Sequence, residues 1–253
     1  MTDTPVSTSF APSDFRVGAV LSRTGTVLSR NFLVFIIVTI VANLPLLLLA
    51  QGMRMIEVGG DAALQSAIIM LALGFVLYLV LIFLSQAVIV HAAFQAMRAR
   101  PVSLGESLSV GLARFLPIIG LAFVSGFLIG LASLALLVPG LILMTMWFVG
   151  APACVVERLG PWTSLKRSAE LTRGHRWKVF GLFALLFIIS NVVSQLISTA
   201  LAPFGSIYLV MVGTLIWSAL WSAYYSITVV VAYHDLRVAK EGVDVDQIAA
   251  VFD

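Results

Sequence analysis

Two rows of polar side chains interrupt an apolar stretch near residue 190. The residues of each row are four positions apart. One row is Ser190, Ser194 and Ser198, and the other is Asn191, Gln195 and Thr199. A third row with the same spacing lies further along the chain and consists of Ser218, Ser222 and Ser226. Residues four apart share one face of a helix, and in hydrocarbon a polar face must meet protein or water. Interhelical hydrogen bonds explain the stripe most simply. A hydrated path for a substrate is the alternative.

A basic segment flanked by tryptophans precedes the polar stripe. Its members are Lys166, Arg167, Arg173, Arg176 and Lys178, with Trp162 and Trp177 on either side. Lysine and arginine next to interfacial tryptophan are typical of contact with anionic lipid headgroups. The same composition also orients and anchors a membrane protein without any specific ligand.

The remaining reactive residue types do not form a catalytic pattern. The histidines, His91, His175 and His234, fall near helix ends together with Glu157 and Asp235. The chain has no HExxH and no CxxC spacing, no nucleophile elbow and no phosphate-cradling loop. The sequence therefore predicts no catalytic residue, no metal site and no cofactor. The lack of paired intramembrane carboxylates argues against a proton-coupled pump.

The amino-acid composition indicates that the polar and basic residues described above are carried by membrane helices. Of 253 residues, 60% are hydrophobic and 11% charged, and the mean hydropathy is +1.07. Soluble domains average roughly 45–50% apolar and about 25% charged residues. The chain is therefore predicted to be an all-α polytopic membrane protein. Its net charge of +3 fits membrane orientation better than nucleic-acid binding.

Six apolar runs are long enough to be membrane helices, because about 20 residues cross a bilayer core. We place them at 32–50, 63–97, 115–138, 141–156, 179–201 and 206–233. The fourth is short and contains Pro152, which predicts a kinked or partial crossing. The second and sixth are long enough to project beyond the bilayer as continuous helices.

Charge in the loops orients the predicted bundle. Of the 15 Lys and Arg residues, only Arg54 falls in an odd-numbered loop. The positive-inside rule therefore predicts a bacterial inner-membrane protein with both termini in the cytoplasm. A membrane domain at 16–242 is expected between a flexible tail at 1–15 and a short cytoplasmic tail at 243–253.

The membrane domain reads as three related units, 16–97, 103–157 and 161–235. Each is predicted to be a cytoplasmic amphipathic helix followed by a hairpin of two membrane helices. The spacing of Ser103 and Glu106 predicts a capping box at the start of the second unit. Asn31 and Gly174 occupy matching places after the first and third amphipathic segments, where a left-handed residue often ends a helix.

A ridge of small residues lies on the third predicted span. Its members, Ala122, Gly126 and Gly130, include a GxxxG pattern that permits close helix approach. Packing inside the bundle is the favoured interpretation, and a dimer contact is the alternative.

Several motifs resemble a known family. They are Val138-Pro139-Gly140, Ala151-Pro152, Val155-Val156-Glu157, Leu165-Lys166-Arg167-Ser168, Leu171-Thr172-Arg173-Gly174 with Trp177, Tyr224-Tyr225, His234-Asp235-Leu236-Arg237 and Glu241-Gly242. This pattern resembles the membrane domain of glycerophosphoryl diester phosphodiesterases and the related YciC-like inner-membrane proteins. The resemblance implies six membrane helices. It implies no activity here, because in fused members hydrolysis belongs to a soluble barrel that this sequence lacks.

Together these features predict a non-catalytic membrane protein. We expect it to organise or regulate a membrane protein partner and to contact anionic phospholipid through the basic segment. Nucleic acid is not expected as a partner. The alternative hypothesis is a transporter of small molecules or lipids that uses the polar faces of the fifth and sixth spans.

Overall fold

The computed structural model describes residues 15–98 and 101–241. This part of the chain is almost entirely α-helical and contains no β-strand. The helices are α1 (Val17–Arg30), α2 (Phe32–Asn43), α3 (Pro45–Val58), α4 (Asp61–Met97), α5 (Leu104–Ala135), α6 (Leu137–Met146), α7 (Gly150–Val156), α8 (Pro161–Thr172), α9 (Arg176–Leu201), the 3₁₀ turn η1 (Ala202–Phe204) and α10 (Ile207–Glu241).

Six segments of the described chain are long and apolar enough to cross a membrane. They are Phe32–Glu57, Asp61–Met97, Leu104–Ala135, Leu137–Val156, Arg176–Phe204 and Tyr208–Glu241. The all-α class and the six spans predicted from hydropathy are thus confirmed, and the chain is built as a multi-pass membrane protein. The second and sixth spans lie in the unbroken helices α4 and α10, of 37 and 35 residues. The predicted tails at 1–15 and 243–253 lie outside the described residues, apart from Phe15.

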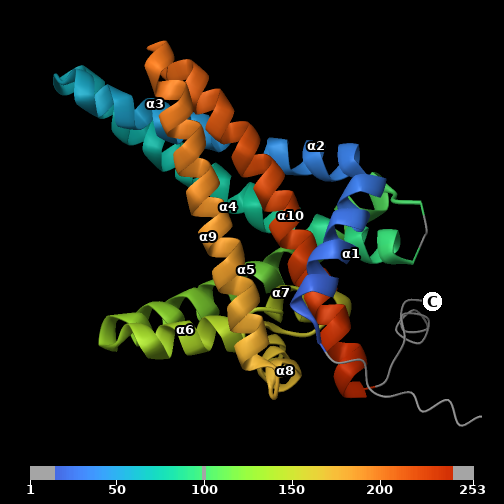
Figure 1. Cartoon of the computed structure of the whole chain (residues 1–253). Helices are drawn as coiled ribbons and strands as arrows, with labels where there is room; N and C mark the ends of the chain where they lie inside the picture. The colour runs from blue at the N-terminus through green and yellow to red at the C-terminus, as the bar shows by residue number, and fades with distance from the viewer. Residues whose placement is uncertain (1–14, 99–100, 242–253) are drawn as a thin grey trace, which may run out of the picture.

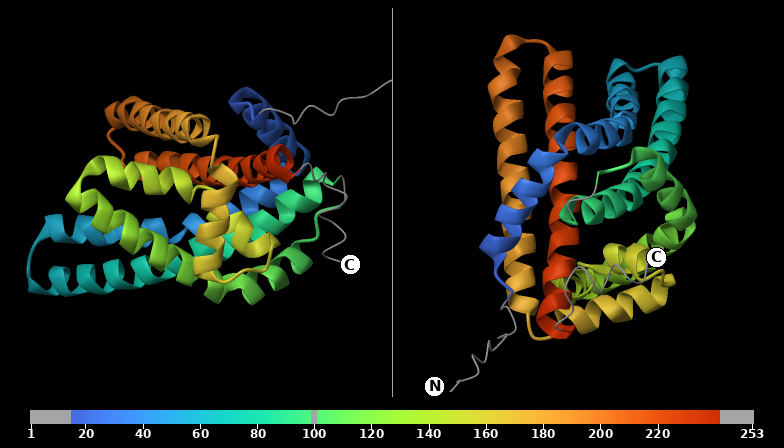
Figure 2. Two further views of the ribbon diagram at one scale, coloured as in Figure 1. Left: turned by 90° about the horizontal axis from the view of Figure 1, so that it is seen from below. Right: turned by 90° about the vertical axis from the view of Figure 1, so that its right-hand side faces the viewer.

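Three pairs of neighbouring helices diverge from one end of the molecule (Figure 1). The pairs are α3 with α4, α5 with α6, and α9 with α10. Figure 2 shows the pairs α3/α4 and α9/α10 side by side as separate arms. The end from which they diverge is formed by α1, α7, α8 and the last turns of α10, and we call it the charged end.

A glycine permits close approach in each helix pair. A Cβ at Gly74 would lie 3.0 Å from Cβ of Leu48, across the α3/α4 contact. A Cβ at Gly140 would lie 1.9 Å from Oγ of Ser133, and one at Gly213 would lie 2.5 Å from Cδ1 of Leu201. A Cβ atom essentially never lies closer than 3.0 Å to such an atom, so a larger residue at Gly140 or Gly213 would force Ser133 or Leu201 to move, and one at Gly74 would be tightly packed against Leu48.

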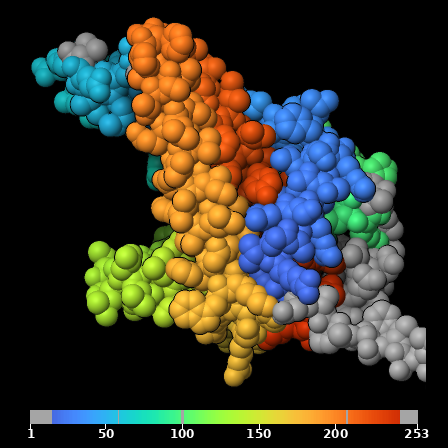
Figure 3. Space-filling view, in the orientation of Figure 1, coloured from blue at the N-terminus to red at the C-terminus, as the bar shows by residue number. Residues whose placement is uncertain are grey.

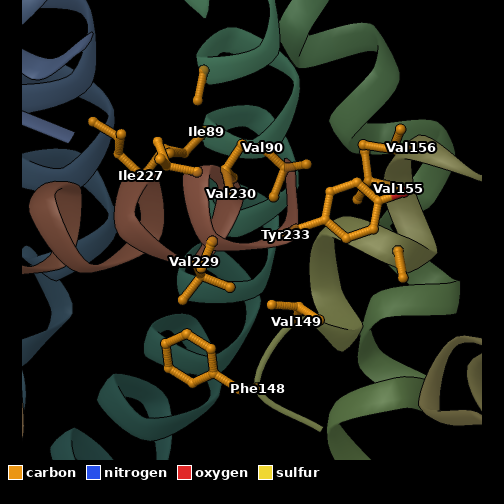
Figure 4. Packing of buried hydrophobic residues seen from close by; sticks show 14 of the residues in the cluster. Ile89, Val90, Phe148, Val149, Val155, Val156, Ile227, Val229, Val230 and Tyr233 are labelled. Atoms are coloured by element: carbon orange, nitrogen blue, oxygen red, sulfur yellow. The ribbon is translucent and has the colours of Figure 1, made fainter. Parts of the chain in front are cut away.

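The apolar core lies at the charged end rather than along the arms. It is formed by the C-terminal halves of α4 and α10, which pack on α7 and α1. Ile89 and Val90 of α4 face Ile227 and Val230 of α10, with Tyr233 against α7 (Figure 4). The arms bury far fewer residues, because their apolar side chains face outward, as expected of surfaces that contact lipid.

The first span is interrupted where α2 meets α3. Pro45 is the first residue of α3, and a proline there cannot donate the backbone hydrogen bond that would continue α2. Asn43 at the end of α2 is buried and donates Nδ2 to the carbonyl of Thr39 at 2.7 Å. The break therefore places an amide side chain inside the bundle.

The fourth span is also interrupted, but not where the sequence suggested. The helix stops after Met146 and resumes at Gly150, so the break precedes Pro152. The hydroxyls of Ser168 and Thr172 donate to the carbonyl of Met146 at 2.8 and 3.3 Å. These bonds satisfy a carbonyl that the end of α6 leaves without a helical partner, so α8 stabilises the break.

The predicted amphipathic segments differ in structure. The first and third are separate helices, α1 and α8, but the second is continuous with α5, so the separate interfacial helix expected there is wrong. Oγ of Ser103 accepts from the backbone N–H of Glu106 at 3.4 Å, which confirms half of the predicted capping box. The reciprocal bond is replaced, because the backbone N–H of Ser103 donates to Oε1 of Gln95 at 3.2 Å. Gly174 has a φ of 93°, as expected, whereas Asn31 has a φ of −129° and is not left-handed.

Candidate functional sites

The basic segment lies at the charged end, on α8 and the first turn of α9. Lys166 is exposed on α8, Arg173 follows that helix, and Arg176 and Lys178 are exposed at the start of α9. Trp162 and Trp177 are also exposed, at 55% and 85% of their surface. We call these six residues the cationic belt. Its charges add to the positive end of the α9 macrodipole, so this surface attracts anions.

An apolar groove of about 420 Å³ runs beside the belt, between α6 and the start of α9. Its lining comprises Val138, Leu141, Ile142, Thr145, Arg176, Trp177 and Phe180. Figure 3 shows α6 standing away from the rest of the molecule next to the lower part of α9. The groove thus joins apolar walls to a guanidinium and an indole, which matches an acyl chain with an anionic headgroup.

Arg167 differs from the rest of the predicted basic segment. Its Nε lies 2.9 Å from both carboxylate oxygens of Glu157, and its Nη2 pairs with Glu241. Its side chain is 23% exposed. Burial alone would lower the pKa of the Arg167 guanidinium, but the hydrogen bonds and charges of Glu157 and Glu241 outweigh burial and raise that pKa. This arginine is a structural partner of two carboxylates.

The ion pairs of Arg167 extend into a network with α10. The hydroxyl of Tyr233 donates to Oε1 of Glu157 at 2.6 Å. Arg237 donates from Nε to Glu241 at 2.9 Å and from Nη1 to the Tyr233 hydroxyl at 3.3 Å. Through these bonds, Arg167 of α8 and Glu157, the residue after α7, are joined to the end of α10. Sequence reasoning missed it, because its members lie up to 84 positions apart.

The polar stripe of α9 divides into two faces. Ser190 and Ser194 line a cavity of about 360 Å³ together with Ser218 and Ser222 of α10. Asn191, Gln195 and Thr199 are exposed on the other side of α9, and Ser198 is half-buried but does not line the cavity. Nδ2 of Asn191 donates to the carbonyl of Phe187 in its own helix at 2.7 Å. Only two of the six residues of the predicted stripe therefore line the cavity shared with α10.

Sequence reasoning also missed the remaining walls of this cavity. They are Asn43, Leu46, Tyr78, Trp217, Trp221 and Tyr225. Trp217 and Trp221 stack with ring centroids 5.5 Å apart. A signal was present on α10, because Trp217, Trp221 and Tyr225 repeat every four residues beside the serine row. Asn43 and Tyr78 come from other helices, and no local pattern pointed to them.

The other candidate positions do not assemble into a site. Among residues 15–98 and 101–241, no group of three or more His, Cys, Asp or Glu side chains could hold a metal ion. His91 Nδ1 lies 3.0 Å from Oγ of Ser107, and His234 Nδ1 lies 3.3 Å from Asp235.

The predicted ridge of small residues lies on α5. Gly126 and Gly130 in that ridge have open space where a Cβ would lie, so the favoured interpretation of the ridge as internal packing is wrong.

Comparison with family models gives one match, to a domain of unknown function, DUF7847, over residues 99–236. The chain belongs to the DUF7847 family. Neither a curated protein nor a solved structure matches it. The matched region begins before α5 and ends within α10, so it contains the groove, the cationic belt and both serine pairs. The resemblance to the phosphodiesterase membrane domain stays a prediction.

Proposed function

We propose that this DUF7847 protein is a non-catalytic inner-membrane protein that binds anionic phospholipid at its charged end and organises or regulates a membrane protein partner. Both termini and the cationic belt lie on the cytoplasmic side in this proposal. The chain would consist of three related units, each with two membrane helices, of which only the first and third keep a separate amphipathic helix.

The observation that carries the proposal is the groove between α6 and α9 beside the cationic belt. Arg176 and Trp177 belong to both features. A phospholipid acyl chain would lie against Leu141 and Ile142, and its phosphate would lie near Arg176 and Arg173. Each basic residue near an anionic membrane surface contributes about 1 kcal/mol of attraction. A belt of this kind therefore selects anionic over neutral lipid.

A matched pair of double variants tests this function. The change Arg173→Gln with Arg176→Gln removes two belt charges and leaves Arg167 in its ion pairs. The control, Arg16→Gln with Arg30→Gln, removes two exposed charges from the two ends of α1. Each protein is purified in nanodiscs that contain equal amounts of phosphatidylglycerol and phosphatidylcholine, and the retained lipids are identified by native mass spectrometry.

We expect the belt variant to lose retained phosphatidylglycerol roughly fivefold for each charge removed, with a smaller loss at high salt. The α1 variant should retain the lipid, because its arginines do not border the groove. Equal retention by the two variants would contradict the proposal. Proteins that co-purify with the wild type but not with the belt variant would identify the partner that the lipid contact positions.

A second candidate function is transport of a small molecule or lipid along the polar faces of α9 and α10. The observation that favours it is the cavity shared by Ser190, Ser194, Ser218 and Ser222. Here Ser190→Leu with Ser194→Leu obstructs the cavity, whereas Asn191→Leu with Gln195→Leu alters only the exposed side of α9. Loss of flux in proteoliposomes with the first variant alone supports transport. Unchanged flux with both variants excludes this path.

A further inference from the structure

The cavity between the α9/α10 pair and α2–α4 is open to its surroundings and is lined by hydroxyl-bearing residues whose hydroxyls have no partner in the described part of the chain. Within residues 15–98 and 101–241, no hydrogen bond is formed by the hydroxyls of Ser190, Ser194, Ser218, Ser222, Tyr78 and Tyr225. Other helical hydroxyls close by do bond: those of Thr39, Ser85 and Thr214 donate to carbonyls of their own helices at 2.8–2.9 Å. The cavity hydroxyls are therefore a distinct set.

The position of these hydroxyls makes their lack of partners significant. The cavity lies between membrane-spanning helices, where a polar group without a hydrogen bond is costly. Serine in a membrane helix can always satisfy its hydroxyl on a carbonyl of the preceding turn. Six residues that line one volume and whose hydroxyls have no partner in the described part of the chain leave donors and acceptors available to a molecule that enters it.

The rest of the lining limits what can enter. No charged side chain lines the cavity within the described part of the chain. An ionic ligand would have no counter-charge there and would lose its hydration. The stacked rings of Trp217 and Trp221 offer a flat apolar surface on one side, and the serines and Asn43 offer hydrogen bonds. A ring with an apolar face and hydroxyls at its edge matches both surfaces.

We propose that this cavity binds a neutral polyhydroxyl group, such as a sugar ring, either free or carried on a lipid. Its volume of about 360 Å³ falls in the range of about 300–1,000 Å³ that is usual for small-molecule sites. Hydroxyls of the ligand exchange hydrogen bonds with Ser194, Ser218 and Ser222, and the ring stacks on Trp217, because the Trp221 ring already stacks with both Trp217 and Tyr224. The proposal does not depend on lipid binding by the cationic belt.

The test uses the full chain in phosphatidylcholine nanodiscs and two tritiated probes in a scintillation proximity assay. The probes are monoglucosyl-diacylglycerol and glucose. Saturable binding of the glycolipid alone assigns a lipid-borne ligand, and saturable binding of glucose assigns a free one. Either result supports the site. Unlabelled glucose 6-phosphate should compete poorly, because the described residues that line the cavity include no cation.

Two variants and a control connect binding to the cavity. The triple change Ser194→Ala, Ser218→Ala and Ser222→Ala removes three hydroxyls with little change in volume and should raise the Kd at least about tenfold. Ser194→Leu fills the cavity and should abolish binding even if the triple variant folds poorly. The control, Ser66→Ala with Ser125→Ala, removes hydroxyls that donate to their own helices and should bind as the wild type does.

Three results would overturn the proposal. The first is the absence of saturable binding of both probes to the wild type. The second is an unchanged Kd in the triple variant and in Ser194→Leu. The third, where glucose itself binds, is competition by glucose 6-phosphate as strong as that by glucose, because the cavity would then accept a charged group.

Discussion

At the scale of single residues, neighbouring basic side chains have different roles. Arg167 is paired with Glu157 and Glu241, whereas Lys166 next to it is exposed and forms no ion pair within the described residues. The two are adjacent in sequence but about 100° apart around α8. One side chain therefore points into the contact with α10, and the other points away from the protein.

Arg167 and Lys166 are predicted to contribute differently to the stability of the protein. Replacing Arg167 by Gln leaves the carboxylates of Glu157 and Glu241 without their shared partner, which should cost about 1–3 kcal/mol. Lys166→Gln should leave stability unchanged, because no ion pair is lost. Thermal unfolding of both variants in the same detergent, followed by tryptophan fluorescence, measures the difference. Equal midpoints would show that the network contributes nothing to stability.

At the scale of helices, glycines on one helix face different surroundings. A Cβ at Gly111 of α5 would lie 2.7 Å from Cγ2 of the buried Val88 on α4. No heavy atom lies within 4 Å of the same point at Gly126, further along α5. The start of α5 therefore packs tightly on α4, whereas the face around Gly126 stays open.

A pair of alanine substitutions tests this contrast. Gly111→Ala forces Val88 or a helix backbone to move and should destabilise the protein by about 1–3 kcal/mol. Gly126→Ala should be neutral or stabilising by up to about 1 kcal/mol, because alanine favours the helix and meets no neighbour. Thermal unfolding of the two variants should therefore shift in opposite directions or differ by several degrees. A lower midpoint for Gly126→Ala would indicate a contact partner on that face.

At the scale of the whole molecule, charge and packing gather at the same end. The core formed by α4, α7 and α10 lies beside the belt and the ion-pair network, while the arms end in short turns at Gly59–Gly60, Leu136 and 202–206. Arg54 is an exception near the far end, where its Cζ lies 5.1 Å from the ring centre of Tyr208. The molecule is therefore a compact end with three diverging membrane arms.

This arrangement predicts the topology in a membrane. With the charged end in the cytoplasm, alkaline phosphatase fused after Glu241 should be inactive, and green fluorescent protein at the same site should fluoresce. Phosphatase inserted between Gly59 and Gly60 should be active. The opposite pattern of reporter activity would invert the predicted orientation and place the belt outside the cell.

Features with a local cause could be predicted from the sequence. Six spans follow from the lengths of apolar runs, and the N-cap at Ser103 follows from the position of Glu106 three residues later. The positive φ at Gly174 is local in the same way. Each depends on residues within one or two turns, so periodicity and composition carry enough information.

Features that depend on distant residues were decided only by the tertiary structure. Asn43 and Tyr78 join Ser194 in one cavity because α2, α4 and α9 each pack against α10 around it. The break after Met146 depends on hydroxyls of α8 about one turn apart and more than twenty residues away. Hydropathy predicts which segments enter a bilayer, but helix packing sets which of their faces meet, because that choice depends on side-chain shape and pairing across the whole chain.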